Sequence, residues 1–181
     1  MPTTIKLGSY FLAVVVLFGS AETSCVSTTG GFQQLTERDL KGGGRLSPAY
    51  SFGVFPSDYN LSKKLSSGPY LLEFFFSGCQ ACKDNRSQFH EVAGKVASEA
   101  AVFEISIDCD MEKTKAWADE TKPSWPVLDT CSDELISELE VGRFPTTLVL
   151  DRERQVILRH VGVWSDDAKE KILTALKRES R

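Results

Sequence analysis

Apolar and polar positions follow a regular pattern only from about residue 50 onward. The run 70–76 is almost entirely apolar, which is typical of a β-strand that is covered on both faces. The segment after it has apolar side chains at helical spacing, which predicts a helix over about 82–101. Apolar and polar residues then alternate over 102–108, so we expect a second strand there.

The rest of the chain continues to alternate between helix and strand signals. We expect a helix over 112–121, a short strand over 125–128, a helix capped by Ser132, strands over 146–150 and 155–161, and a last helix capped by Ser165. This order is a βαβ unit followed by a hairpin and a helix. It predicts one α/β domain over 50–181, with a central mixed sheet flanked by helices.

The first 21 residues have the build of a secretory signal peptide. Lys6 provides a positive charge, the apolar run 7–18 follows, and Ala21 ends a stretch of small residues suited to cleavage. The run is shorter than the roughly 20 residues that a membrane-spanning helix needs. We therefore expect export and removal of residues 1–21. Residues 22–49, which contain glycine clusters, are predicted to form a flexible linker.

Cys25 offers a second outcome for this region. Small residues precede it, as at the sites where bacterial lipoproteins are cut and acylated, but Glu22 stands where such sites carry an aliphatic residue. Lipidation of Cys25 would leave an even four cysteines. The protein is therefore predicted to be periplasmic or in the cell envelope, either released or lipid-anchored through Cys25.

Composition and charge exclude two classes of protein. The chain is 41% hydrophobic and 10% aromatic, which excludes a disordered protein. Its net charge is −4 and it has no basic run, so nothing indicates nucleic-acid binding. We expect a monomer.

The most informative motif is the Cys79-Gln80-Ala81-Cys82 segment, at the predicted change from strand to helix. Exposed N–H groups at a helix start favour a thiolate, and the thiolate is the attacking species in disulfide exchange. Cys79 at the exposed helix start would be the nucleophile, and the shielded Cys82 would resolve the mixed disulfide. The alternatives are a structural disulfide or half of a zinc site, but the sequence has no second CxxC and no paired histidines.

Three segments of the sequence resemble the thioredoxin superfamily: LEFFFSGCQACK at 72–83, VGRFPTT at 141–147 and HVGV at 160–163. The resemblance covers about 50–181 and implies a thioredoxin-like fold. It also implies that Pro145 is cis and faces the CxxC motif, where the loop of Phe144 and Pro145 would pair with the substrate backbone.

Two further features narrow the resemblance. The stretch from Met111 to Cys131 is long enough for an extra helix and strand before the Pro145 strand. This insertion, on an exported and tethered chain, resembles the TlpA/ResA-like periplasmic thiol:disulfide oxidoreductases. The chain differs from thioredoxins at the motif itself, where Gly78 replaces the usual tryptophan and Gln80-Ala81 the usual Gly-Pro. The direction of electron flow therefore cannot be read from the motif.

Glu73 lies six residues before Cys79, at the position where thioredoxins hold a buried acid. Burial would raise the pKa of its carboxyl group, which could then take the proton from Cys82 during resolution. The alternative is a residue at the strand end whose carboxylate reaches solvent.

Cys109 and Cys131 each follow a predicted strand. If the two strands are parallel neighbours, a structural disulfide between these cysteines is geometrically feasible. Two unpaired cysteines, or a second redox relay, are the alternatives. His90 is expected to be a polar surface residue and His160 to lie on a terminal strand. Neither has a spacing that makes it a partner of Cys79 or a metal ligand.

These features predict an exported thiol:disulfide oxidoreductase that uses no metal or other cofactor. Its expected substrates are cysteines of other exported proteins, including apocytochromes during haem attachment. The resemblance implies a membrane thiol-disulfide shuttle as electron partner. A copper-delivery protein on the same scaffold and a non-catalytic interaction domain are the alternatives.

Overall fold

The computed structural model describes residues 44–46, 50, 52–57 and 68–180 of the 181-residue chain. The predicted signal peptide and Cys25 lie outside the described residues. Along these residues the elements are β1 (Gly53–Phe55), β2 (Tyr70–Phe75), α3 (Gln80–Val96), β3 (Ala101–Ser106), α4 (Met111–Thr121), β4 (Val127–Asp129), α5 (Asp133–Glu138), β5 (Thr146–Leu150), β6 (Val156–Val161) and α6 (Asp166–Glu179).

The strands form one mixed sheet in the order β1-β4-β3-β2-β5-β6. Strand β2 is parallel to β3, and β3 is parallel to β4. The other pairings, β2 with β5, β5 with β6 and β1 with β4, are antiparallel. Because β2 has a neighbour on each side and layers on both faces, all six of its residues are buried, which explains its nearly continuous apolar sequence.

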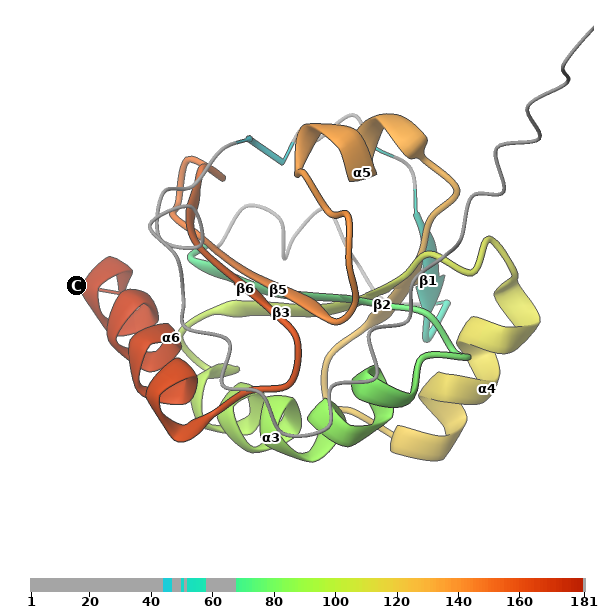
Figure 1. Cartoon of the computed structure of the whole chain (residues 1–181), viewed down its shortest axis with the longest axis horizontal. Coiled ribbons are helices and arrows are strands. Elements are labelled where there is room, and N and C mark those ends of the chain that lie inside the picture. Colours follow the sequence, from blue (N-terminus) through green and yellow to red (C-terminus); the bar gives the residue numbers. More distant parts are fainter. Residues whose placement is uncertain (1–43, 47–49, 51, 58–67, 181) are drawn as a thin grey trace, which may run out of the picture.

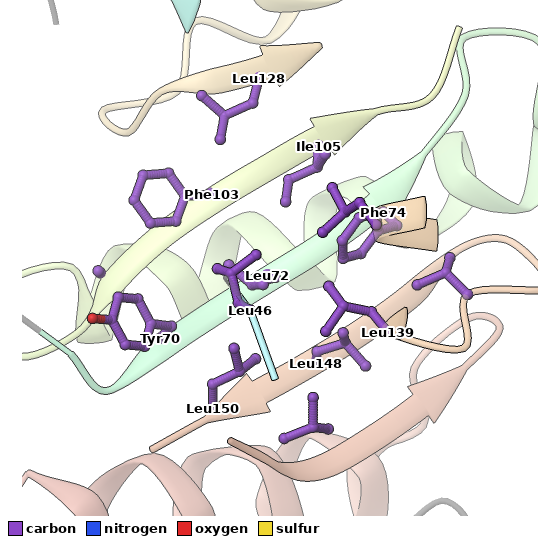
Figure 2. Close-up of a cluster of buried hydrophobic side chains, with 14 residues drawn as sticks. Leu46, Tyr70, Leu72, Phe74, Phe103, Ile105, Leu128, Leu139, Leu148 and Leu150 are labelled. Atoms are coloured by element: carbon purple, nitrogen blue, oxygen red, sulfur yellow. The ribbon is translucent and has the colours of Figure 1, made fainter. Parts of the chain in front are cut away.

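Helices cover both faces of the sheet (Figure 1): α3 and α6 lie on one side and α5 lies on the other. Alternate residues of β2 therefore enter different cores. Tyr70, Leu72 and Phe74 pack on the α5 side, as Figure 2 shows, with Phe103 and Ile105 of β3. On the opposite face, the apolar core contains side chains of α3 and α6.

The predicted caps of two helices are confirmed. The Ser132 hydroxyl accepts the Leu135 N–H at 3.1 Å, and the Ser165 hydroxyl accepts the Ala168 N–H at 3.2 Å. A serine before each helix is thus enough to fix where the first turn begins.

The predicted α/β architecture is confirmed, and α4 and β4 fill the long stretch from Met111 to Cys131. Strand β1 was not predicted, because three residues give too short a pattern. Part of the predicted linker also contacts the domain: Leu46 is buried, and its N–H bonds to the Arg154 carbonyl at 3.1 Å. The folded unit therefore includes 44–46. None of the helices in the described ranges is long and apolar enough to cross a membrane.

Candidate active site: a dithiol at the start of helix α3

Cys79 is the N-cap of α3, directly after the loop that leaves β2. Its sulfur accepts the backbone N–H of Cys82 at 3.2 Å, and its thiol donates to the Phe144 carbonyl at 3.8 Å. The sulfur therefore receives an N–H that no helical partner satisfies, at the positive end of the helix dipole. This is an environment that favours a thiolate at Cys79.

Cys82 lies one turn into the helix and is fully buried. The hydrogen bond with Cys79 raises the pKa of the Cys82 thiol above its ordinary value, and burial raises it further. Cys82 thus keeps its proton while Cys79 is the better anion. The two residues have the different characters that an attacking and a resolving cysteine need. Both are thiols in the structure.

The expectation that Cys79 is exposed is wrong: only 1% of its surface is accessible. Cys79 and Cys82 belong to a small apolar cluster with Phe75, Trp117 and Val127. Trp117 comes from α4, far from the motif in sequence, so no local pattern could reveal that it packs here. Gly78 and Gln80, on either side of Cys79, are exposed, so the buried sulfur lies next to the protein surface along the chain.

The Phe144–Pro145 loop lies opposite Cys79, and its peptide bond is cis. The Phe144 ring meets the Phe76 ring edge to face, with centroids 5.6 Å apart. The Pro145 carbonyl accepts the Gly162 N–H at 2.8 Å, which ties the loop to the end of β6. The residues predicted to border a substrate are therefore brought to the dithiol.

Glu73 is buried on the α3 side of β2, not solvated at a strand end. Its carboxyl group accepts the Asn85 amide N–H at 2.9 Å and faces the Thr147 hydroxyl at 3.5 Å. Burial raises the pKa of Glu73 well above its usual range, and the neighbouring Glu104 raises it further. A buried carboxyl group of this kind can hold or accept a proton near neutral pH.

Glu104 is the feature of this region that the sequence analysis did not single out. It is 2% exposed and accepts hydrogen bonds from the indoles of Trp117 and Trp125 and from His90. The sequence signal for Glu104 is a glutamate among the apolar residues of a predicted strand. The structure buries all six residues of that strand. The expectation that His90 is a polar surface residue is therefore wrong. His90 is half-buried, and its Nε2 lies 2.8 Å from a carboxyl oxygen of Glu104.

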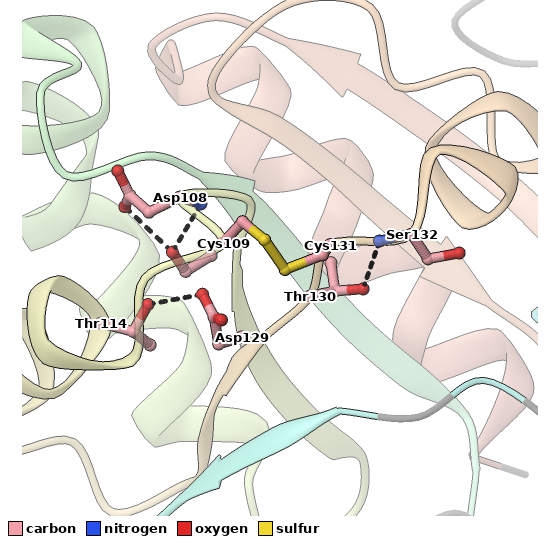
Figure 3. Close-up of a disulfide and its surroundings, with 8 residues drawn as sticks. Asp108, Cys109, Thr114, Asp129, Thr130, Cys131 and Ser132 are labelled. Atoms are coloured by element: carbon pink, nitrogen blue, oxygen red, sulfur yellow. Dashed lines mark hydrogen bonds between the residues drawn. A yellow bond between two sulfur atoms is a disulfide. The ribbon is translucent and has the colours of Figure 1, made fainter.

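Cys109 and Cys131 are joined by a disulfide in the structure (Figure 3), with their Cα atoms 4.8 Å apart. They follow the ends of β3 and β4, which are parallel neighbours. Both residues are exposed. Between this bond and the dithiol lies Asp108, whose carboxylate accepts the backbone N–H of Ser77 at 2.7 Å.

His160 is buried on β6, as its predicted place on a strand requires, and its Nε2 lies 3.4 Å from the Val163 carbonyl. Among the described residues there is no group of three or more His, Cys, Asp or Glu side chains arranged to hold a metal ion.

Three solved structures have the same arrangement of elements. A candidate thiol:disulfide interchange protein DsbE from Chlorobium tepidum is 20% identical, with a TM-score of 0.65, covering 78% of this chain and 99% of its own. The thioredoxin domain of a thiol-disulfide oxidoreductase from Bacteroides vulgatus is 18% identical, with a TM-score of 0.62, and the coverages are 76% and 99%. A thiol-disulfide isomerase from Corynebacterium glutamicum is 16% identical, with a TM-score of 0.62 and coverages of 74% and 96%.

No protein-family model matches the sequence, and no curated protein matches it either. At these identities the structural likeness establishes the fold. The chain has the thioredoxin-like fold that the sequence resemblance implied.

Proposed function

We propose that this protein is an exported thiol:disulfide oxidoreductase that exchanges disulfides with cysteines of cell-envelope proteins through Cys79 and Cys82. The observation that carries the proposal is the hydrogen bond from the Cys82 N–H to the Cys79 sulfur, at the start of α3 and opposite the Pro145 loop. The thiol:disulfide interchange proteins with this fold provide independent support.

The reductive direction proceeds in two exchanges. The Cys79 thiolate attacks one sulfur of a client disulfide, and the other client sulfur leaves as a thiolate. Cys82 then gives its proton to the Glu73 carboxylate and attacks Cys79. The Cys79–Cys82 disulfide forms, and the client leaves with both of its cysteines reduced. Two electrons pass to the client, and the reverse sequence oxidises it.

The Phe144–Pro145 loop would hold the client in this scheme. Its backbone is tied to β6 and lies against Cys79, so an extended client segment could pair beside the sulfur. We propose Phe144 and Pro145 as the substrate-binding residues. The client class is exported proteins with cysteines, including apocytochromes, and a membrane thiol-disulfide shuttle would recharge the dithiol.

The test is single-turnover exchange with a disulfide-bonded peptide, comparing the wild type with Cys79→Ser and with the Cys109→Ser/Cys131→Ser double variant. We expect Cys79→Ser to reduce exchange to the uncatalysed rate and the double variant to retain it. Exchange by Cys79→Ser at the wild-type rate would contradict the proposal. A copper(I) titration of the reduced protein distinguishes the metal-delivery alternative, which requires stoichiometric binding that depends on Cys79 and Cys82.

A further inference from the structure

A second buried carboxylate, Glu104, lies beside Glu73 in the sheet. The register of β2 and β3 pairs the two residues directly, and neighbouring strands are about 4.8 Å apart. Because paired residues of adjacent strands point to the same face, both side chains enter the layer between the sheet and α3. Two acidic groups in one buried layer cost free energy unless each is protonated or has hydrogen-bond donors that compensate its charge.

Three hydrogen-bond partners surround the carboxyl group of Glu104. One oxygen accepts the Trp117 indole N–H at 2.7 Å, and the other accepts the Trp125 indole at 2.9 Å and His90 Nε2 at 2.8 Å. An indole N–H only donates. Several donors directed at one carboxyl group are the arrangement that suits a carboxylate.

The surroundings of Glu73 are different. Asn85 of α3 and Thr147 of β5 provide uncharged donors to one of its oxygens. Cys79 lies at the start of α3, and a negative charge on its sulfur opposes ionisation of Glu73. Glu73 therefore has less support for a negative charge than Glu104 has.

The basic side chains near Glu73 are directed at other groups. Arg86 of α3 lies 3.8 Å above the Trp117 ring and pairs with Glu120. His90 contacts Glu104. On the other side, His160 of β6 is paired in register with Thr147 of β5, so it lies two strands away from Glu73. Arg86 and His90 thus contact groups other than the Glu73 carboxyl group, whereas Glu104 is the direct partner of Glu73 in the register of β2 and β3.

We propose that Glu104 is a positioning residue, and that a negative charge on its carboxyl group sets the pH above which Glu73 can take the proton from Cys82. The proposal rests on the proposed function, because the proton transfer belongs to the resolving step. In that step the Cys82 proton moves to the Glu73 carboxylate, the Cys79–Cys82 bond forms and the client thiolate leaves. Glu104 makes and breaks no bond. It acts by making ionisation of Glu73 harder, in addition to the effect of burial.

The direct test is the protonation of Glu73, followed by the infrared carbonyl band of its carboxylic acid as the pH is raised. The band is assigned by its loss in Glu73→Gln. We expect Glu104→Gln to lower the midpoint by roughly 1–3 pH units, since a like charge beside Glu73 is removed. The control is Glu99→Gln, which removes the same charge from an exposed position and should leave the midpoint unchanged. An unchanged midpoint in folded Glu104→Gln overturns the proposal.

A second variant keeps the test decisive if Glu104→Gln does not fold. His90 is partly exposed, so His90→Lys should be tolerated and would place a permanent cation beside Glu104. Its charge offsets that of Glu104, and we expect the midpoint to fall by a smaller amount. An unchanged midpoint in this variant contradicts the proposal as well.

The resolving step provides the second readout. The rate of release of a peptide from its mixed disulfide with Cys79 should rise with pH through the same midpoint and should move with it in Glu104→Gln. If the wild type exchanges no disulfides, the proposed function fails while the infrared titration still decides the effect of Glu104. If exchange is normal and neither the infrared midpoint nor the rate profile moves, Glu104 serves only to satisfy the two indoles and the proposal is wrong.

Discussion

The two cysteine pairs of this protein lie at the carboxyl ends of neighbouring strands, yet their surroundings are opposite. Cys79 and Cys82 are buried thiols at the first turn of a helix, with an N–H directed at the first sulfur. Cys109 and Cys131 are exposed and joined by a disulfide. Each lies one residue before a helix N-cap, Asp110 of α4 and Ser132 of α5, and the cap side chains, not the sulfurs, accept the N–H groups of the first turn. The two pairs therefore differ in burial, in bonding and in their relation to the helix that follows.

The comparison indicates what exchange requires. The first pair has one sulfur that accepts a helix N–H, a second whose pKa is raised, and a buried acid, Glu73, in the same layer. The second pair closes a loop between β3 and β4 and holds their ends together. We assign exchange to the first pair and cross-linking to the second, and the predictions below test that division.

The largest effect is expected from Cys82→Ala. Without the second thiol, a client bound to Cys79 waits for an outside thiol, and the high effective concentration of Cys82 is lost. Resolution should slow by about 10³-fold or more. Non-reducing gels of the tagged variant should show long-lived adducts. Adducts that appear only when Cys109 and Cys131 are also replaced would assign a relay role to the second pair.

Removal of the Cys109–Cys131 disulfide should lower stability and leave disulfide exchange unchanged. The bond has a sequence separation of 22 residues, so Cys109→Ser/Cys131→Ser should lower the free energy of unfolding by about 3 kcal/mol. Urea unfolding measures this change, and turnover should stay close to the wild-type value. Loss of exchange in a variant that remains folded would contradict the division between the two pairs.

The effect of Glu73→Gln on stability should depend on pH. Relative to the wild type, the variant should become more stable as the pH rises. The pKa of Glu73 is higher in the folded protein than in the unfolded chain, so ionisation destabilises the fold as the pH passes from the unfolded to the folded value. The variant lacks this penalty. Its unfolding free energy relative to the wild type should be about 1–3 kcal/mol more favourable at pH 8 than at pH 4. A constant difference between the two pH values would show that Glu73 does not titrate as proposed.

The smallest effect concerns the link between the two regions. Asp108, beside Cys109, accepts hydrogen bonds from the backbone and hydroxyl of Ser77, two residues before Cys79. Asp108→Asn removes the charge but keeps one acceptor, and should cost about 1 kcal/mol of stability. Alkylation of Cys79 should change by only a few-fold. A larger effect on Cys79 than on stability would mean that the second region controls the first.

Much of the fold could be predicted from the sequence because its signals are local. The apolar run at β2, the caps at Ser132 and Ser165 and the alternation along β3 each depend on neighbours in the chain. Strand β1 gave too short a pattern, and Leu46 gave none, since one leucine in a polar segment does not reveal that it enters the core.

The site was predictable only where it is contiguous. The motif placed Cys79 and Cys82 at a helix start, and the resemblance indicated Glu73 and Pro145. Cys79 lies in a cluster with a tryptophan from α4, and Glu104 is bonded by side chains from α3, α4 and the loop before β4. Contacts of this kind follow from the packing of distant segments, which residue periodicity does not encode.

The most direct test of the account is a redox titration of the wild type in glutathione buffers, with each cysteine pair quantified by alkylation and mass spectrometry. We expect Cys79 and Cys82 to convert together between dithiol and disulfide as one two-electron couple. The Cys109–Cys131 bond should stay oxidised throughout. A titration in which Cys109 and Cys131 respond and Cys79 and Cys82 do not would contradict the assignment of exchange to the helix-start pair.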